Sequence, residues 1–430
     1  MGKRLNFLVL GLLVLVVLLA GATYAPPLPE ADILPIDTGD TAWMLVASAF
    51  VLLMTPGLAF FYGGMVNRKS IISTMMQSFV ALGVISVLWV IVGFSLAFGE
   101  SIGGFVGNPL TYFAFHGVTT APNPDFATTI PFLLFALFQL KFAIITPALI
   151  TGSFAERVRF RSYLLFMVLF SLLIYSPLAH MTWHPEGLLR NWGVLDFAGG
   201  TVVHMSAGFA ALAGATFLGK RKQQTHDPAN VPFIILGTGL LWFGWFGFNA
   251  GSALGANGDA VIAFANTNLA SAAAMITWMF YERFRGRKMS AVGACIGAIV
   301  GLVAITPAAG FVTIGQSIFI GFVAAMISNW SISWFSRSNI DDTLDVFPSH
   351  GVGGIAGMIL TGIFANEVGL IHGETTTFFY HLLALGLVSA FTYGGSYLLY
   401  LLVNAILPMR VTEKQESKGL DRSQHGEWVR

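Results

Sequence analysis

The sequence predicts an all-α integral membrane protein with eleven transmembrane helices, built as two inverted five-helix repeats plus an eleventh helix. The first observation is composition: 55% of the 430 residues are hydrophobic and only 10% are charged, whereas soluble domains carry about 25% charged residues. The second is a series of eleven apolar segments, and the third is a collection of basic residues in every second loop between them.

The overall charge and the cysteine content exclude several other classes. The formal net charge of +1 argues against a nucleic-acid partner, which would need a basic patch. Cys295 is the single cysteine, so the chain has no internal disulfide framework and lacks the cysteines of common structural zinc sites.

The first 25 residues have the layout of a secretory signal peptide. Lys3 and Arg4 precede an apolar run that ends in small residues at Ala25. An uncleaved membrane anchor is the alternative, because the apolar run is long for a signal peptide. The predicted division is a signal peptide at 1–25, a membrane domain at 26–407 and a cytoplasmic regulatory tail at 408–430.

Eleven segments after Thr41 provide the roughly 20 mostly apolar residues that a membrane helix needs. In chain order they are 42–65, 71–98, 129–153, 160–181, 197–219, 231–250, 258–281, 290–306, 311–335, 349–366 and 376–407. Prolines within the first, third and fourth segments predict kinks, whose freed carbonyls neighbouring helices can satisfy. Glycines recur every four positions near the sixth, in the eighth and in the tenth, which indicates closely packed helices.

Basic residues orient these helices in the membrane. They follow the odd-numbered segments, at Arg68, Lys69, Arg157, Arg159, Arg161, Lys220, Arg221, Lys222, Arg283, Arg285, Arg287, Lys288, Arg337, Arg410, Lys414, Lys418, Arg422 and Arg430. The loops on the other side carry only Arg190. Because basic loops stay in the cytoplasm, the membrane domain starts outside and the carboxyl tail ends inside. The segments and their orientation predict a multi-pass membrane protein.

The fifth and tenth segments resemble each other internally. The fifth opens with Asp196 and carries His204, and the tenth opens with DDTLDVFPSHG, which places Asp345 before His350. Inverted repeats run these two helices in opposite directions, so the histidines approach the membrane midplane from opposite faces. His204 lies eight residues after Asp196, about 12 Å deeper at 1.5 Å per residue.

Ionisable residues inside membrane helices are functional candidates, because burying them is costly. Lys141, His180 and His381 belong to this set, and the two last are interpreted as structural because they lie near helix ends. For His204 and His350 two interpretations remain open. They are either two separate, satisfied core histidines, or a hydrogen-bonded pair that stays neutral along an apolar path.

Aromatic and hydroxyl side chains surround this pair in the sequence. Trp183 and Ser252 lie at the outer ends of the fourth and sixth segments, and Phe142, Trp245 and Phe248 lie deeper. Such stripes commonly form lipid contacts or core. Here they also suit a small cation that loses its water and its proton, since a desolvated cation–π contact is worth about 2 kcal/mol.

Six segments resemble the Amt/MEP/Rh ammonium transporter family, and they resemble its bacterial Amt branch more closely than its Rh branch. They are PGLAFFYGGMV, SFAERVRF, DFAGGTVVH, GWFGFNAGSA, AITPAAGFV and DVFPSHGVGGI. The resemblance extends from about Trp43 to the carboxyl tail.

The resemblance implies a role for each candidate residue. Trp183, Ser252 and Phe142 resemble the external ammonium-recruitment site, Phe142 and Phe248 the phenyl gate, His204 and His350 the pore-lining twin histidines, and Asp196 with Trp245 the residues that support the site. The family is homotrimeric with one pore in each subunit, and PII-type signal proteins regulate bacterial members at the tail. No cofactor and no enzyme activity are implied.

Two departures from the family pattern stand out. Lys141 precedes the gate phenylalanine, where the family usually has a small residue, and it would repel ammonium if it faced the entrance. His184–Gly187 reads HPEG, where the family commonly has a glycine run. Two other functions are therefore weighed against transport. Lys141 favours an ammonium-sensing receptor of the same fold with little flux, and the buried histidines are compatible with a membrane haem enzyme.

Overall fold

The computed structural model describes residues 34–224 and 227–429, together with Gly11, Val14, Leu15 and Leu18. The predicted signal peptide at 1–25 and its cleavage point lie outside the described residues, apart from those four positions.

Ten helical segments in the described ranges are long and apolar enough to cross a membrane, and α12 (Ala291–Ile305) is a shorter apolar helix. The all-α membrane class is confirmed, and α12, which is the eighth predicted segment (290–306), is shorter than the others. The ten segments are α2 (Thr38–Met65); α3 (Ile71–Leu88) with η2 (Trp89–Gly93) and α4 (Phe94–Phe98); α5 (Phe132–Ile150) with η4 (Thr151–Phe154); α6 (Phe160–Phe170) with η5 (Ser171–Tyr175), α7 (Ser176–Trp183) and α8 (Leu188–Asn191); η6 (Gly200–Met205) with α9 (Ser206–Leu218); α10 (Val231–Ala250) with η7 (Gly251–Ala253); α11 (Gly258–Phe284); α13 (Ile314–Phe335); η8 (Phe347–Gly351) with α14 (Val352–Phe364); and α15 (Thr376–Ile406).

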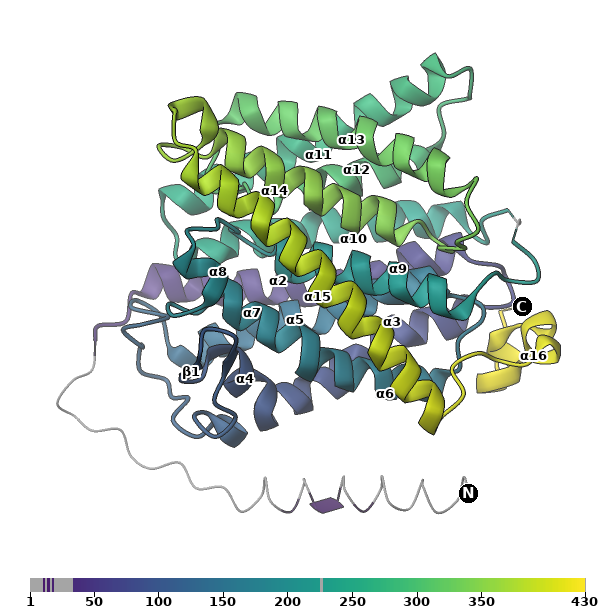
Figure 1. Cartoon of the computed structure of the whole chain (residues 1–430), viewed down its shortest axis with the longest axis horizontal. Coiled ribbons are helices and arrows are strands. Elements are labelled where there is room, and N and C mark those ends of the chain that lie inside the picture. The colour runs from purple at the N-terminus through teal and green to yellow at the C-terminus, as the bar shows by residue number, and fades with distance from the viewer. Residues whose placement is uncertain (1–10, 12–13, 16–17, 19–33, 225–226, 430) are drawn as a thin grey trace.

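The helices form one bundle in which segments far apart in sequence lie side by side. Figure 1 shows α11, α12 and α13 packed together along one edge, and α15 crossing the face of the bundle obliquely. The helix α10 packs along α2, and α15 packs against α9 and α14. Helices η6–α9 and η8–α14 lie at the centre, where most of their residues are buried.

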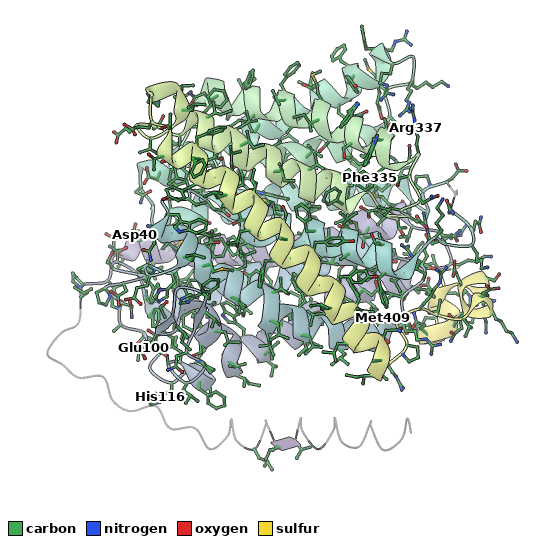
Figure 2. All side chains as sticks on the ribbon, in the orientation of Figure 1. Asp40, Glu100, His116, Phe335, Arg337 and Met409 are labelled. Atoms are coloured by element: carbon green, nitrogen blue, oxygen red, sulfur yellow. The ribbon has the colours of Figure 1, made fainter. Side chains whose placement is uncertain are left out.

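The loops separate onto two opposite sides of the bundle. Asp40, Glu100 and His116 lie on one side, and Arg337 and Met409 lie toward the other (Figure 2). The first side also holds a feature that the sequence did not predict, a short hairpin in which β1 (Ser101–Ile102) pairs antiparallel with β2 (Val106–Gly107). The second side holds the tail, with α16 (Glu413–Lys418) and η10 (Asp421–His425).

Small residues allow the central helices to touch. A Cβ atom at Gly208 in α9 would clash with the backbone of Gly351 in η8, and one at Gly357 would clash with the carbonyl of Ala304 in α12. Backbones approach this closely in lipid only where side chains are absent. The fifth and tenth spans therefore cross in direct contact next to the two histidines.

Candidate functional site

The two histidines predicted to form a pair lie against each other at the centre of the bundle. Nδ1 of His350 lies 3.3 Å from Nδ1 of His204, and their ring centroids are 5.4 Å apart. The rings are 4% and 1% exposed, respectively. The geometry therefore favours the paired interpretation over two separate core histidines. A haem held by two axial imidazoles would occupy the space between them, and this hydrogen-bond distance leaves no room for it.

Each histidine belongs to a π-helical segment at the start of its span. His204 lies in η6, and its amide donates to the carbonyl of Gly199, five residues earlier in the chain. His350 lies in η8, the corresponding segment of the tenth span. Such π turns are rare and occur frequently at functional sites, because they rotate a side chain away from the position that a regular α-helix gives it.

Asp196 lies just before η6 and caps it. One carboxylate oxygen accepts hydrogen bonds from the amides of Gly199 at 2.8 Å and Gly200 at 2.6 Å. The other accepts from the amide of Thr201 at 2.7 Å and from its hydroxyl. All four donors belong to the first turn of the span, where unpaired amides and the helix dipole favour an anion. Both oxygens of the Asp196 carboxylate thus accept hydrogen bonds from the protein's own chain.

The acid that corresponds to Asp196 in the tenth span is Asp342, and the interpretation that gave this place to Asp345 is wrong. The amide of Phe347, the first residue of η8, donates to a carboxylate oxygen of Asp342 at 2.7 Å. No side-chain hydrogen bond of Asp345 is found in the described residues. Asp342 precedes His350 by eight residues, as Asp196 precedes His204. The sequence offered three candidate acids in DDTLD, and the equal spacing could have identified the correct one.

A column of aromatic rings rises from the histidines. The His204 ring stacks on Trp245 at 5.3 Å and on Phe248 at 5.9 Å between centroids. Phe248 in turn lies 4.2 Å from Phe142. Phe142 packs edge-on against Trp183 at 5.9 Å. The four predicted aromatic residues therefore form one continuous series of ring contacts, although they come from three different spans.

The top of the column carries polar groups. The Trp183 indole nitrogen donates to the backbone carbonyl of Asp196 at 3.1 Å. The hydroxyl of Ser252, in η7, donates to the carbonyl of Phe248 at 2.8 Å. Trp183 and Ser252 are only partly buried, whereas Phe142 and Phe248 are 1% and 0% exposed. The column thus passes from a half-open polar rim to a closed apolar centre.

Lys141 lies beside this column but outside its ring contacts. It is half-buried, whereas its neighbour Phe142 is fully buried. Neither a hydrogen bond nor an ion pair involves Lys141 within the described ranges.

His180 and His381, which are interpreted as structural, are both buried and hydrogen-bonded to the main chain. His180 contacts the carbonyl of Ala97, and His381 accepts from the amide of Leu195.

Two cavities follow on the other side of the histidine pair. The first has a volume of about 10 Å³ and is lined by Tyr62, Ser349 and His350 among others. A volume of about 10–15 Å³ holds one water-sized molecule. The second, of about 300 Å³, is lined by Arg221 and Asp345. Both cavities include Met65 and Leu344 in their walls, so these residues separate the narrow space from the wide one.

Charged residues hold the loops around the wider cavity. Arg221 pairs with Glu156 at 3.2 Å and with Asp341 at 2.9 Å. Burial raises the pKa of Asp342 to about 6, although the Phe347 amide and Arg157 oppose this shift. Burial also raises the pKa of Asp345 to about 8, and the neighbouring charge of Asp342 adds to the rise. These carboxyls hold protons more tightly than acids in water do.

Some residues of the site gave no usable signal in the sequence. Thr306 accepts a hydrogen bond from the Trp245 indole nitrogen at 2.9 Å and fixes its orientation against His204. The two residues are 61 positions apart, and no pattern in one sequence pairs them. Thr201, which binds Asp196, could have been found from its place in the first turn after the acid.

Comparison with known proteins places these features in a wider context. Residues 42–429 match the Ammonium Transporter Family. An ammonium transporter of Aquifex aeolicus is 47% identical over 401 residues, covering 91% of this chain and 93% of that protein. One from Bacillus subtilis is 44% identical, covering 90% and 98%.

Solved structures agree with the sequence relatives. The crystal structure of Saccharomyces cerevisiae Mep2 matches with a TM-score of 0.83 and 37% identity, over 88% of this chain and 89% of that one. The structure of a protein named "Sensor Amt Protein" also matches with a TM-score of 0.83, at 28% identity, over 90% and 98%.

Proposed function

Because the chain belongs to the ammonium transporter family, we propose that it conducts ammonium or ammonia across the inner membrane through a pore lined by His204 and His350. The observation that carries the proposal is the 3.3 Å contact between the two imidazoles at the closed end of an aromatic column. Each ring nitrogen of a neutral imidazole is either a donor or an acceptor. The pair can therefore hydrogen-bond a small polar molecule as it moves from one ring to the next.

Recruitment takes place at the half-open rim. The Ser252 hydroxyl donates its hydrogen bond to the backbone carbonyl of Phe248. The lone pairs of its oxygen therefore remain to accept a hydrogen bond from an N–H of ammonium. The faces of Trp183 and Phe142 supply cation–π attraction. Asp196 supports this site indirectly, because its carboxylate is held by the first turn of the span and its carbonyl holds the Trp183 indole.

Passage beyond the rim requires the cation to lose its proton. Phe142 and Phe248 close the route with rings 4.2 Å apart, and moving them aside admits an uncharged molecule at far lower cost than a charged one. Ammonium becomes ammonia by giving up a proton, which either returns to water at the half-open rim or passes to the neutral imidazoles of His204 and His350, whereas K⁺ has no proton to give. Selectivity against K⁺ follows from this difference. The cavity of about 10 Å³ beyond His350 is of the right size for one such molecule.

Uptake into proteoliposomes tests the proposal. We expect an ammonium or methylammonium gradient to drive uptake above that of empty vesicles, with K⁺ excluded. His204→Ala and His350→Ala are expected to change flux or to admit K⁺, whereas His116→Ala, on an exposed outer loop, leaves both unchanged. Unchanged methylammonium flux together with unchanged K⁺ rejection in both histidine variants would remove the pore role from the pair.

The second candidate is an ammonium-sensing receptor, in which the same rim binds ammonium and the tail signals. One structural neighbour is named "Sensor Amt Protein", and Lys141 places a cation near the gate. The same vesicles decide between the two functions, because a receptor gives no flux above empty vesicles. Comparison with Lys141→Ser then tells whether the lysine itself limits flux.

Three further properties stay predictions of this proposal. The protein is expected to be a homotrimer with one pore in each subunit, which size measurement in detergent tests. A PII-type signal protein is expected to bind the tail at 408–430. The side that carries the basic loops, with the tail folded against it, is expected to face the cytoplasm.

A further inference from the structure

The loop that carries Ser252 is a short, irregular connection between α10 and α11. It begins with η7 and ends at Asn257, which caps α11 by accepting from the amide of Ala260 at 3.0 Å. Within it, Leu254 has a φ of 56°, a left-handed conformation that is rare for residues other than glycine. So little regular structure requires contacts from another element to keep the Ser252 hydroxyl in one place.

The start of α2 supplies these contacts at both ends of the loop. A carboxylate oxygen of Asp40 accepts from the amide of Ala256 at 2.8 Å, four residues after Ser252. The indole nitrogen of Trp43 donates to the carbonyl of Ala250 at 3.4 Å, two residues before Ser252. Asp40 and Trp43 are three positions apart in one helix and therefore share a face of α2.

Two glycines allow the loop to lie against this face. A Cβ atom at Gly255 would lie 3.0 and 3.1 Å from the two carboxylate oxygens of Asp40. A Cβ atom at Gly251 would lie 2.9 Å from the Cβ atom of Ala47, which follows on the same stripe of α2. Because neither glycine has a side chain, the loop backbone comes within hydrogen-bonding distance of the helix.

Asp40 is itself held by the first turn of α2. Its amide donates to a carboxylate oxygen of Asp37, the cap of this helix, at 2.9 Å, and the amide of Asp37 donates to the carbonyl of Thr129 at 2.8 Å. In the described part of the chain Asp40 forms no ion pair. The helix dipole alone favours an acid in a first turn, but it does not account for the bond to Ala256.

We propose that Asp40 is a positioning residue for the recruitment site. Through the Ala256 amide it fixes the loop, and with the loop the oxygen of Ser252 that accepts from ammonium. The inference rests on the proposed function, because it takes the rim as the place where ammonium binds, and it applies to a transporter and to a receptor alike.

A second way for Asp40 to act is through its charge, since a carboxylate near the rim also attracts cations through space. Asparagine separates the two. It keeps an oxygen that accepts from the Ala256 amide, and it has no charge. The positioning role therefore predicts that Asp40→Asn resembles the wild type, whereas a role of the charge predicts that it resembles Asp40→Ala.

The first measurement is hydrogen–deuterium exchange of segment 251–257 in the purified full-length protein, which does not depend on transport. Asp40→Ala is expected to speed exchange of the Ala256 amide at least about fivefold, because this amide loses its partner. The second measurement is methylammonium binding by calorimetry. Asp40→Ala is expected to weaken binding about fivefold, the usual weight of one intramolecular hydrogen bond, and Asp40→Asn to restore most of it.

Gly255→Ala tests the same contact from the other side, because its methyl group displaces the Asp40 carboxylate. It is expected to weaken methylammonium binding, and the double change with Asp40→Ala is expected to be no weaker than Asp40→Ala alone. Asp259→Ala is the matched control. It removes an exposed acid from the first turn of α11, at the end of the same loop, and should alter neither exchange nor binding.

Three outcomes would overturn the inference. These are wild-type affinity in Asp40→Ala, equal weakening in Asp40→Asn and Asp40→Ala, and a double variant that shows the product of the two single effects. A wild-type protein that binds no methylammonium would instead contradict the recruitment rim of the proposed function, and the exchange of the Ala256 amide would still report whether Asp40 holds the loop.

Discussion

The single hydroxyl proton of Ser252 determines what this residue can offer to a ligand. Because that proton goes to the Phe248 carbonyl, the oxygen faces the rim as an acceptor only. In the proposed function, such an acceptor suits ammonium, which is a hydrogen-bond donor in every direction.

Ser252→Ala is expected to raise the half-saturating concentration of methylammonium about tenfold, because a hydrogen bond to a charged group contributes about 1.5 kcal/mol at a partly exposed site. Initial rates of uptake over a range of concentrations measure this change. Ser252→Thr keeps the hydroxyl and should restore most of the affinity. Equal half-saturation for the alanine and threonine variants would show that the hydroxyl does not contact the substrate.

Single residues also show how far sequence reasoning reaches. Asp196 and His204 could be singled out because an acid and an imidazole are rare in membrane helices. The residue that orients Trp245 could not, since Thr306 is an ordinary hydroxyl residue whose importance comes only from the helix that packs against it. Composition identifies costly residues, whereas packing determines what satisfies them.

Among the secondary-structure elements, the π-helical starts of the fifth and tenth spans are what position the histidines. The sequence predicted both spans to within a few residues, because hydropathy depends on composition alone. It could not predict the π turns, since residues 200–205 and 347–351 have no distinctive composition. Asp342 is different, because its eight-residue distance from His350 equals that of Asp196 from His204 and could have identified it, and the hydrogen bond from the Phe347 amide shows that it caps η8.

The buried carboxyl of Asp342 makes this element sensitive to pH. Its pKa is raised to about 6 by burial, whereas an unfolded chain has the ordinary value of 3.8. Between about pH 4 and pH 6 the folded protein holds a proton that the unfolded chain has lost, so the free energy of unfolding falls as pH rises through this window. Asp345, with a pKa raised to about 8, extends the decline above pH 6.

Asp342→Asn is expected to reduce the decline between pH 4 and pH 6 by about 2 kcal/mol, because asparagine does not titrate and still offers an oxygen to Phe347. Melting temperatures in detergent at pH 4, 5, 6 and 7 measure the effect. Asp125→Asn, at an exposed loop position, is the control and should keep the wild-type slope. A slope unchanged in Asp342→Asn would mean that Asp342 is ionised throughout this range.

On the scale of the whole molecule, the carboxyl tail connects loops of the basic side that are far apart in the sequence. Arg410 binds the carbonyls of Leu218 and Lys220 as well as the carboxylate of Glu416. Farther along, Asp421 accepts from the amide of Ser73 at the start of α3. Figure 1 shows α16 folded beside the bundle at this end. The tail was predicted as a separate regulatory segment, and its fold against the loops lay beyond sequence reasoning because it depends on a residue 348 positions away.

Asp421→Ala is expected to loosen the tail, because loss of an acidic cap at a helix start costs about 1–2 kcal/mol. Limited trypsin digestion of the purified protein should then cut at Lys414, Lys418 or Arg422 about tenfold faster than in the wild type. Glu427→Ala alters an exposed acid of the same tail and should leave the rate unchanged. Identical cleavage in the two variants would show that the Ser73 contact does not hold the tail.

The equal distance from each capping acid to its histidine has a consequence for how the protein can change over generations. Deleting one residue between Asp196 and His204, or between Asp342 and His350, would turn the imidazole by about 100° and shift it by about 1.5 Å, enough to separate the pair. The exposed loop around His116 does not have to keep a fixed length. Among related sequences, insertions and deletions are therefore expected in the loops and not in these two eight-residue intervals, even where substitutions within the intervals are tolerated.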